Sequence, residues 1–301
     1  MTKQLLDRRA LGLALSRVAD ATVWHGRLVD SGALNRAQRI ALTGAPGAGK
    51  STLAGHLAIK RMAGRRLGVL AIDPSSPKSG GAILGDRVCI DELAGSEELY
   101  IRSLGSRSAT DGLTDNLPEM LDVMDAFEFD EVIVETVGVG QAEYAVRSQV
   151  DTVVLVLLPD SGDVVQAMKA GIMEMADIFV VNKSDLAGAN RMAADIQRIA
   201  ALTKTAPGGW RPPVVLTSAR QPPSLAALSA EIDRHWAWLA ISDRAAELAL
   251  ERAKYRLKRA MDRLVSARLS AMSHDSFERP LAEQVSTLLK ALAVDRENAA
   301  P

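Results

Sequence analysis

Seven short apolar runs, each leading into polar residues, recur between residues 39 and 219. They read RIALTGA, LGVLAID, LYIRSL, FDEVIVET, DTVVLVLLP, DIFVVNK and PPVVLTSA. The segments between them are compatible with helices, and β-branched runs that alternate with helices are typical of a parallel sheet. We therefore expect an α/β domain over residues 39–240, with a mostly parallel central sheet flanked by helices.

The two ends of the chain lack this alternation. Leucines at helical spacing predict a helix over residues 3–38, and hence an N-terminal helical extension over residues 1–38. Beyond residue 240 the pattern is helical throughout, which predicts a C-terminal helical arm over residues 241–301. Ser242 or Asp243 could cap the start of that arm.

The arm combines an apolar and a basic pattern. Leu250, Leu257 and Leu264 lie a heptad apart, which is compatible with a coiled-coil or dimerisation seam. An amphipathic helix packed on its own domain has the same periodicity, and periodicity alone favours it. Arginines and lysines between residues 252 and 268 could meet an acidic partner, although such a run is more often a solvated face.

Composition narrows the class of protein. The 301 residues carry a net charge of −1, which favours neither a nucleic-acid partner nor a membrane surface. The single cysteine, Cys89, excludes an internal disulfide. The longest apolar run, residues 152–159, is too short to span a bilayer, and the N-terminus has no uninterrupted apolar region typical of a signal peptide. We expect a cytoplasmic protein with no nucleic-acid and no membrane partner.

The strongest chemical signal is GAPGAGKST, residues 44–52, between an apolar run and a helix-compatible stretch. It matches the phosphate-binding P-loop, in which glycines let backbone amides wrap a polyphosphate. Lys50 would reach the β- and γ-phosphates, and Ser51 would bind Mg²⁺. The residues expected to hold nucleotide here are Gly44, Gly47, Ala48, Gly49, Lys50, Ser51 and Thr52.

Two further motifs predict that the base is guanine. NKSD, Asn182 to Asp185, follows an apolar run, and TSA, residues 217–219, follows the next one. A carboxylate at Asp185 would accept from the ring N–H and the exocyclic amino group of guanine, whereas adenine would leave it unpaired. The base-binding residues expected here are Asn182, Lys183, Asp185, Ser218 and Ala219.

ETVGVGQAE, residues 135–143, has the pattern of a metal-binding acid followed by a switch loop. Glu135 would hold Mg²⁺ directly or through water, and the amide of Gly138 would sense the γ-phosphate. Val139 stands where small signalling GTPases place a water-orienting glutamine, which predicts slow intrinsic hydrolysis. Gln141 could enter the site when a partner docks.

A loop with two carboxylates, AIDPSSPKSGGAILGDR (residues 71–87), follows the second apolar run. Asp73 and Asp86 are candidate Mg²⁺ ligands beside the phosphates. The Ser/Gly segment between them is expected to act as a switch that is ordered by the triphosphate. Without the P-loop upstream, the same composition would indicate a plain surface connector.

In this order, GAPGAGKST, IDPSSPKSGGAILGDR, ETVGVGQAE, NKSD and TSA resemble the MeaB/MMAA (ArgK-type) P-loop GTPases. The resemblance covers roughly residues 39–240. It implies a GTPase that binds GTP and GDP with Mg²⁺ and chaperones a cobalamin-dependent acyl-CoA mutase. Such proteins gate adenosylcobalamin delivery and reactivation of the mutase, and they are typically homodimers to which the C-terminal arm contributes.

The resemblance also carries residue roles. It implies Mg²⁺ ligands at Ser51, Asp73, Asp86 and Glu135. It further implies a client-responsive switch over residues 160–172, in which Lys169 is the residue to test.

The chain departs from the family where residues 101–116 read IRSLGSRSATDGLTDN and where Lys78 follows the DPSS segment. These departures leave the client open, with isobutyryl-CoA mutase or 2-hydroxyisobutyryl-CoA mutase as alternatives to methylmalonyl-CoA mutase.

Three other functions use a similar scaffold. A nickel-insertion maturation GTPase usually carries cysteine or histidine ligands near its switches, whereas this chain has one cysteine and four scattered histidines. An ATP-dependent kinase is disfavoured by NKSD and by the lack of an evident substrate-binding insert. A binding-only regulator, for which hydrolysis is incidental, needs the same residues as a GTPase and stays open.

Overall fold

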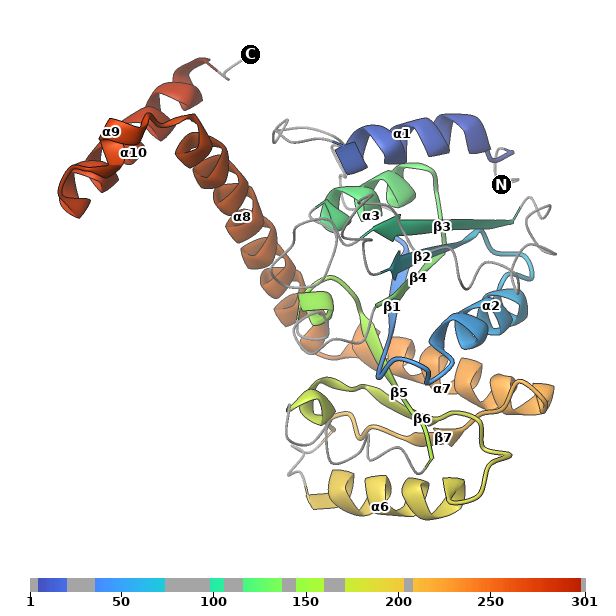
Figure 1. The fold of residues 1–301 in the computed structure, drawn as a ribbon. Coiled ribbons are helices and arrows are strands. Elements are labelled where there is room, and N and C mark those ends of the chain that lie inside the picture. Colours follow the sequence, from blue (N-terminus) through green and yellow to red (C-terminus); the bar gives the residue numbers. More distant parts are fainter. Residues whose placement is uncertain are drawn as a thin grey trace.

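The structure is a computed structural model of the chain. It describes residues 5–20, 36–73, 98–105, 116–136, 145–159, 171–202 and 208–298. Within these residues the chain forms a sheet covered by helices on both faces, from which a helical arm projects (Figure 1).

The core is a seven-stranded sheet in which every pair of neighbouring strands is parallel, in the order β3-β2-β4-β1-β5-β6-β7. The strands are β1 (Gln38–Thr43), β2 (Leu67–Asp73), β3 (Leu99–Gly105), β4 (Glu131–Glu135), β5 (Thr152–Leu157), β6 (Ile178–Val181) and β7 (Val214–Leu216). The seven strands coincide with the seven apolar runs, so the predicted α/β class and the predicted parallel sheet are confirmed.

Helices cover both faces of the sheet. The helices of the domain are α1 (Arg8–Asp20), α2 (Lys50–Arg61), α3 (Leu117–Ala126), the 3₁₀ helix η3 (Ile172–Met175), α6 (Ala189–Leu202) and α7 (Pro222–Ile241). Helices α1 and α3 share one buried cluster with the sheet, α6 and η3 form a second, and α2 and α7 form a third. Strand β5 explains the division, because Val153 and Leu155 point toward α3 and α6 while Val154 points toward α2 and α7.

The N-terminal helix is shorter than the predicted span of residues 3–38. Residues 5–7 and 36–37 are not helical, and Gln38 already belongs to β1. Leu11 and Leu15 are fully buried against the sheet, so α1 contributes to the core of the domain. The predicted helix overlapped the first strand at Gln38, because Gln38 is a polar residue at a buried strand position, where periodicity gives no signal.

The chain ends in the helices α8 (Arg244–Ala271), α9 (His274–Phe277) and α10 (Leu281–Asn298), as the pattern beyond residue 240 predicts. Asp243 occupies the N-cap position of α8, but its side chain makes no capping hydrogen bond, and its backbone carbonyl accepts from Ala246 and Glu247 instead. The Ser242 hydroxyl donates to Leu239 O, at the end of α7.

The arm contacts its own domain through arginines rather than leucines. Leu250 and Leu257 are 56% and 66% exposed, and Leu248 is the buried residue of α8, so packing of the leucine stripe on the domain, favoured by periodicity, is wrong. The basic side is not simply solvated either. Arg256 forms an ion pair with Asp122, and Arg263 with Glu119, both on α3.

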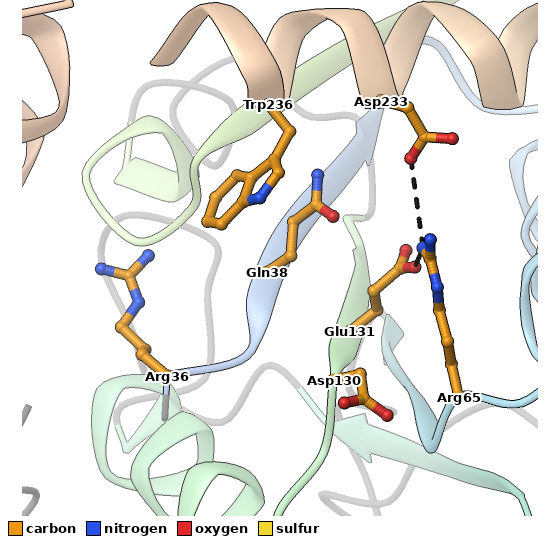
Figure 2. A pocket seen from close by; sticks show the side chains of 7 residues that line it. All are labelled: Arg36, Gln38, Arg65, Asp130, Glu131, Asp233 and Trp236. Carbon is orange, nitrogen blue, oxygen red and sulfur yellow. Dashed lines mark hydrogen bonds and ion pairs between the residues drawn. The ribbon is translucent and has the colours of Figure 1, made fainter. Parts of the chain in front are cut away.

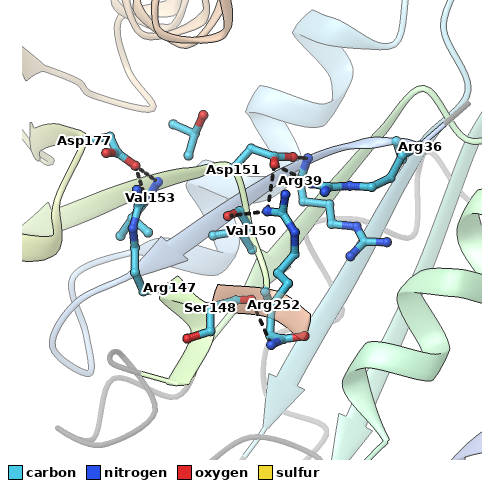
Figure 3. A network of polar contacts seen from close by, with 12 residues as sticks. Arg36, Arg39, Arg147, Ser148, Val150, Asp151, Val153, Asp177 and Arg252 are labelled. Atoms are coloured by element: carbon cyan, nitrogen blue, oxygen red, sulfur yellow. Dashed lines mark hydrogen bonds and ion pairs between the residues drawn. The ribbon is translucent and has the colours of Figure 1, made fainter. Parts of the chain in front are cut away.

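Arg252 anchors the base of the arm (Figure 3). Its guanidinium donates to Asp151 Oδ1 at 3.1 Å, and Asp151 also accepts from Arg36 and from the backbone N–H of Arg39. Burial among these neighbouring arginines lowers the pKa of Arg252 to about 10, and Asp151 opposes this shift. The arm, the start of β1 and the start of β5 therefore meet at one carboxylate.

No described helix combines the length and the apolar character needed to cross a membrane. The cytoplasmic location stays a prediction.

One buried histidine lies where β5 and β6 meet α7. The His235 side chain is fully buried, its Nδ1 lies 2.9 Å from Thr152 Oγ1, and its Nε2 lies 3.5 Å from Asp177 Oδ1. Trp210 packs edge-on against the ring, and Trp238 stacks on it. Burial lowers the pKa of His235 below its ordinary value, while Asp177 pulls it upward by a smaller amount.

We expect His235 to make the fold less stable in mild acid. Because the folded-state pKa of His235 is lowered, the unfolded chain binds the proton more readily than the folded chain. The contribution of His235 to the free energy of unfolding is therefore fully present above the unfolded-state pKa of about 6.5. It is lost as the pH falls below that value. His235→Asn should flatten the pH dependence of the free energy of unfolding between about pH 6.5 and pH 5. Urea unfolding at several pH values measures this, with the exposed His274→Asn as the control. Equal slopes for wild type and His235→Asn would contradict the assignment.

Candidate functional site

The residues with candidate chemistry gather at the carboxyl ends of the strands. The P-loop follows β1, Glu135 ends β4, Asp73 ends β2, Asn182 follows β6 and Ser218 follows β7. In the sheet, β1 lies between β4 and β5. Strands β4, β2 and β3 lie on one side of β1, and β5, β6 and β7 lie on its other side, so the strand order reverses at β1. Ligands of open α/β sheets bind at such a reversal of strand order.

Close packing explains the glycines of the P-loop. Gly44 has φ +139°, and a Cβ there would lie 2.0 Å from the carbonyl oxygen of Val156 on β5. Gly49 has φ +83°, and its Cβ would lie 2.7 Å from Asn182 Nδ2. Only glycine permits this backbone path at both positions. Gly49 is the N-cap of α2 and provides no capping side chain, so the first N–H groups of α2 face the loop.

Lys50 is the first residue of α2 and is buried. Its ammonium donates to the carbonyl oxygens of Gly44, at 2.8 Å, and Ala45, at 3.1 Å. The positive charge is thus held inside the loop, where a bound polyphosphate would lie.

Ser51 and Glu135 meet across α2 and β4. The Ser51 hydroxyl donates to Glu135 Oε1 at 2.5 Å, and Glu135 is 8% exposed. A hydroxyl and a carboxylate are the hard oxygen ligands that Mg²⁺ prefers, so this pair fits a magnesium ion beside the phosphates. Behind it, Thr136 Oγ1 donates to Thr43 Oγ1 at 2.9 Å and joins the ends of β4 and β1.

Asn182 joins the NKSD segment to the P-loop. Its Nδ2 donates to Ala48 O at 2.8 Å, and its Oδ1 accepts from Thr217 Oγ1 at 3.0 Å. Lys183 adopts a left-handed φ of 54°, which is uncommon for a residue with a side chain, and its Nζ lies 3.1 Å from Gly47 O. The NKSD, TSA and P-loop segments therefore form one connected structure.

Asp185 is held by one residue of the TSA segment and by the residue that directly follows it. Ser218 Oγ donates to Asp185 Oδ1 at 2.6 Å, and Arg220 Nη1 lies 3.3 Å from Asp185 Oδ2. The hydrogen bond from Ser218 lowers the pKa of Asp185, and the charges of Arg220 and Lys183 add to this effect. Asp185 is therefore an ionised acceptor at neutral pH, as guanine recognition requires.

The other predicted site residues are placed less fully. Thr52 is part-buried in the first turn of α2, and Ala219 is exposed in the turn after β7. The backbone of Asp73 is paired with that of Gly105 at the end of β2. Asp86, Gly138, Gln141 and Lys169 lie outside the described residues, so their roles stay predictions.

The geometry adds residues that the motifs did not single out. Thr43 and Thr136 form a buried pair next to Glu135, and Val156 requires glycine at position 44. Arg220 directly follows the TSA tripeptide, but an arginine in a turn gives no sequence signal of its own. Each is recognised only when strands distant in sequence are brought together.

A polar cavity of about 220 Å³ lies at the amino-terminal ends of the strands, opposite the candidate nucleotide site (Figure 2). Its lining residues are Arg36, Gln38, Arg65, Asp130, Glu131, Asp233 and Trp236. Gln38 and Glu131 are the first residues of β1 and β4, whereas the P-loop follows the last residue of β1. This cavity is therefore separate from the candidate nucleotide site, and ion pairs such as that of Arg65 with Glu131 compensate its charges.

A sequence model of the family described as methylmalonyl-CoA mutase-associated GTPase MeaB matches residues 9–274. The chain belongs to the MeaB family. A GTPase-named protein of Pyrococcus abyssi is 40% identical over 239 residues, covering 77% of this chain and 72% of that protein. A GTPase-named protein of Caulobacter vibrioides is 38% identical over 265 residues, covering 86% and 81%.

Three further matches differ in identity and in the share of each chain that they cover. The mitochondrial methylmalonic aciduria type A homologue of Mus musculus is 41% identical over 188 residues, covering 60% of this chain and 45% of that protein. A crystal structure titled LAO/AO transport system kinase matches with a TM-score of 0.63 at 22% identity, covering 98% of this chain and all of that one. HypB from Helicobacter pylori in complex with nickel matches with a TM-score of 0.50 at 14% identity, covering 73% and 92%. The two structures show the shared fold alone.

We expect Gly44→Ala to impair nucleotide binding in this MeaB-family chain. The added Cβ would collide with the Val156 carbonyl in a backbone conformation that already disfavours side chains, and strain of about 1–3 kcal/mol would displace the loop. Fluorescence titration with labelled GDP should show roughly a ten- to hundredfold weaker Kd.

Gly64→Ala is the matched control for this prediction. Gly64 also has a left-handed φ, of 71°, but a Cβ there would meet nothing within 4 Å, and it lies in the turn after α2. This variant should keep the wild-type Kd. An unchanged Kd for Gly44→Ala would show that the loop tolerates the displacement.

Proposed function

We propose that this MeaB-family protein is a GTP-hydrolysing switch that chaperones a cobalamin-dependent acyl-CoA mutase. In this role it would gate adenosylcobalamin delivery and reactivation of its client. The observation that carries the GTPase part is the side chain of Asn182, which ties the segment for reading guanine to the phosphate loop. The match to a mutase-associated GTPase family supports the client class.

The catalytic roles follow from the charges at the loop. Lys50 and the amides at the start of α2 would hold the β- and γ-phosphates and stabilise the charge that develops in the transition state. Ser51 and Glu135 would hold Mg²⁺, together with Asp73 and Asp86 in the proposed ligand set. The metal, when bound, would neutralise charge on the phosphate oxygens. Asp185 would accept both adjacent donors of guanine.

Three loops are the proposed switches: residues 73–87, 135–143 and 160–172. They would be drawn together by GTP through contacts such as the amide of Gly138, and would relax after hydrolysis. Val139 gives no side chain that could orient the attacking water, so intrinsic turnover should be slow. Client docking would then supply or order the missing element, with Gln141 and Lys169 as the residues to test.

The alternatives receive less support. Among the described residues, no group of three or more His, Cys, Asp or Glu side chains is arranged to hold a metal ion, and the likeness to HypB extends to the fold alone. An ATP-dependent kinase would leave the carboxylate of Asp185 facing the wrong edge of adenine. The client stays open among methylmalonyl-, isobutyryl- and 2-hydroxyisobutyryl-CoA mutases.

We further propose that the protein is a homodimer that pairs through the leucine side of the arm. That side is unpacked while the arginine side is docked on α3. The exposed apolar residues of α8 include Leu250, Leu257 and Met261, and those of α10 include Leu281 and Leu289. Burial of such a stripe against a second copy would remove it from water.

The test of function is GTP turnover by the purified protein, alone and with each of the three mutases. We expect a slow basal rate that one mutase raises strongly, by up to roughly 10³–10⁵-fold if docking completes the site as trans-acting elements do elsewhere. Lys50→Ala should abolish turnover under both conditions, because the charge on the phosphates is then uncompensated.

A basal rate that is already fast would refute the incomplete-site mechanism. A rate that none of the mutases changes would separate the GTPase from the proposed clients. Turnover of Lys50→Ala at the wild-type rate would overturn the assignment of the P-loop itself.

We expect Leu257→Glu to shift the protein from dimer to monomer, because it places a charge at the centre of the proposed seam. Analytical ultracentrifugation at several concentrations measures this. Lys258→Glu is the matched control. It changes the charge of the neighbouring exposed residue, which is not one of the leucine positions of the proposed seam. A wild-type monomer at all concentrations would refute pairing through the arm.

A further inference from the structure

Arg220 contacts the guanine-reading carboxylate by two routes. Its side-chain Nη1 lies 3.3 Å from Asp185 Oδ2. Its backbone N–H donates to Ser218 Oγ at 3.2 Å, and Ser218 Oγ in turn donates to Asp185 Oδ1 at 2.6 Å. One residue therefore engages both oxygens of the carboxylate, one directly and the other through a hydroxyl.

The backbone route fixes the direction of the Ser218 proton. Because Ser218 Oγ already accepts from Arg220 N, its own hydrogen is free to point at Asp185. Ser218 is buried, and its backbone N–H lies 3.1 Å from Ser224 Oγ at the start of α7, so this donor is rigidly placed. Oδ1 of Asp185 is thus fixed by the fold, whereas Oδ2 is fixed by the Arg220 guanidinium.

Asp185 can accept from two donors of guanine at once only if both of its carboxylate oxygens are held in place. The terminal torsion of an aspartate side chain has a broad energy well, so a carboxylate held at one oxygen can still rotate. Guanine presents its ring N–H and its 2-amino group side by side, and both oxygens must lie in the plane of the base to accept from them. A rotated carboxylate could still accept one donor.

The exposure of Arg220 separates this role from a structural one. Its side chain is 83% exposed, and an exposed ion pair contributes little to the free energy of unfolding. The pair of Arg198 with Asp195 is also exposed, at 3.1 Å with 76% exposure of the arginine. It lies within α6, which contains no residue of the NKSD, TSA or P-loop motifs. We therefore expect the Arg220 contact to affect nucleotide selectivity and to leave the free energy of unfolding nearly unchanged.

We propose that Arg220 is a positioning residue for base selectivity, which holds the carboxylate plane of Asp185 so that it accepts both donors of guanine. The inference rests on the proposed function, in which Asp185 reads guanine. It assigns selectivity for the 2-amino group to a residue outside the NKSD and TSA motifs.

The experiment compares GDP with IDP, whose base lacks the 2-amino group, by isothermal titration calorimetry. Arg220→Gln should weaken GDP binding by about fivefold, the scale of ordering one side chain, and leave IDP within about twofold of wild type. Arg220→Lys should recover part of the difference, because its ammonium restores the charge without the planar fork. Arg198→Gln, the matched control, should change neither Kd.

The outcomes separate this inference from the proposed function. Equal weakening of GDP and IDP, or no change in either, would overturn the role of Arg220 while guanine binding stands. A wild-type protein without preference for GDP over IDP would also overturn it, because no second donor would then be read. If the wild-type protein binds neither GDP nor IDP, the guanine assignment fails and this inference fails with it. The same conclusion follows if the Asp185→Asn variant binds GDP with the wild-type Kd.

Discussion

The side-chain amide of Asn182 is the contact on which the candidate site depends. Its two ends bond to Ala48 O in the P-loop and to Thr217 Oγ1 after β7, so it connects segments more than 130 residues apart in one buried position. A buried amide that loses one partner costs free energy, so the two loops hold one another in place. Gly49 is part of the same constraint, because any side chain there would displace the amide.

The parallel sheet provides the frame for this contact. Because every strand runs the same way, the loops after β1, β2, β4, β6 and β7 all emerge at one edge, and the chemistry of the protein is gathered there. The amino-terminal ends of the strands carry buried ion pairs, such as Arg61 with Glu131, which ties α2 to β4. The polar cavity at these ends belongs to this network.

The arm reverses the usual arrangement of an amphipathic helix. Arg256, Arg263 and Arg252 face inward to Asp122, Glu119 and Asp151, while Leu250 and Leu257 face solvent. Long arginine side chains can reach carboxylates at the domain surface while their charge stays paired. The helix is therefore held on the domain although Leu250 and Leu257 are not buried. This leaves an apolar surface for a partner, and it places the anchor of the arm at Asp151, a few residues beyond the proposed switch at residues 135–143.

The sequence by itself determined the fold class, the positions of all seven strands and the order of the nucleotide motifs. It could do so because buried parallel strands need continuous apolar runs, and because a P-loop needs glycines at fixed spacing. The tertiary structure alone decided which face of α8 docks, that the strand already begins at Gln38, and that Arg220 meets Asp185. Those outcomes depend on pairings between polar side chains distant in the chain, and periodicity, which records only whether a position is apolar, does not contain them.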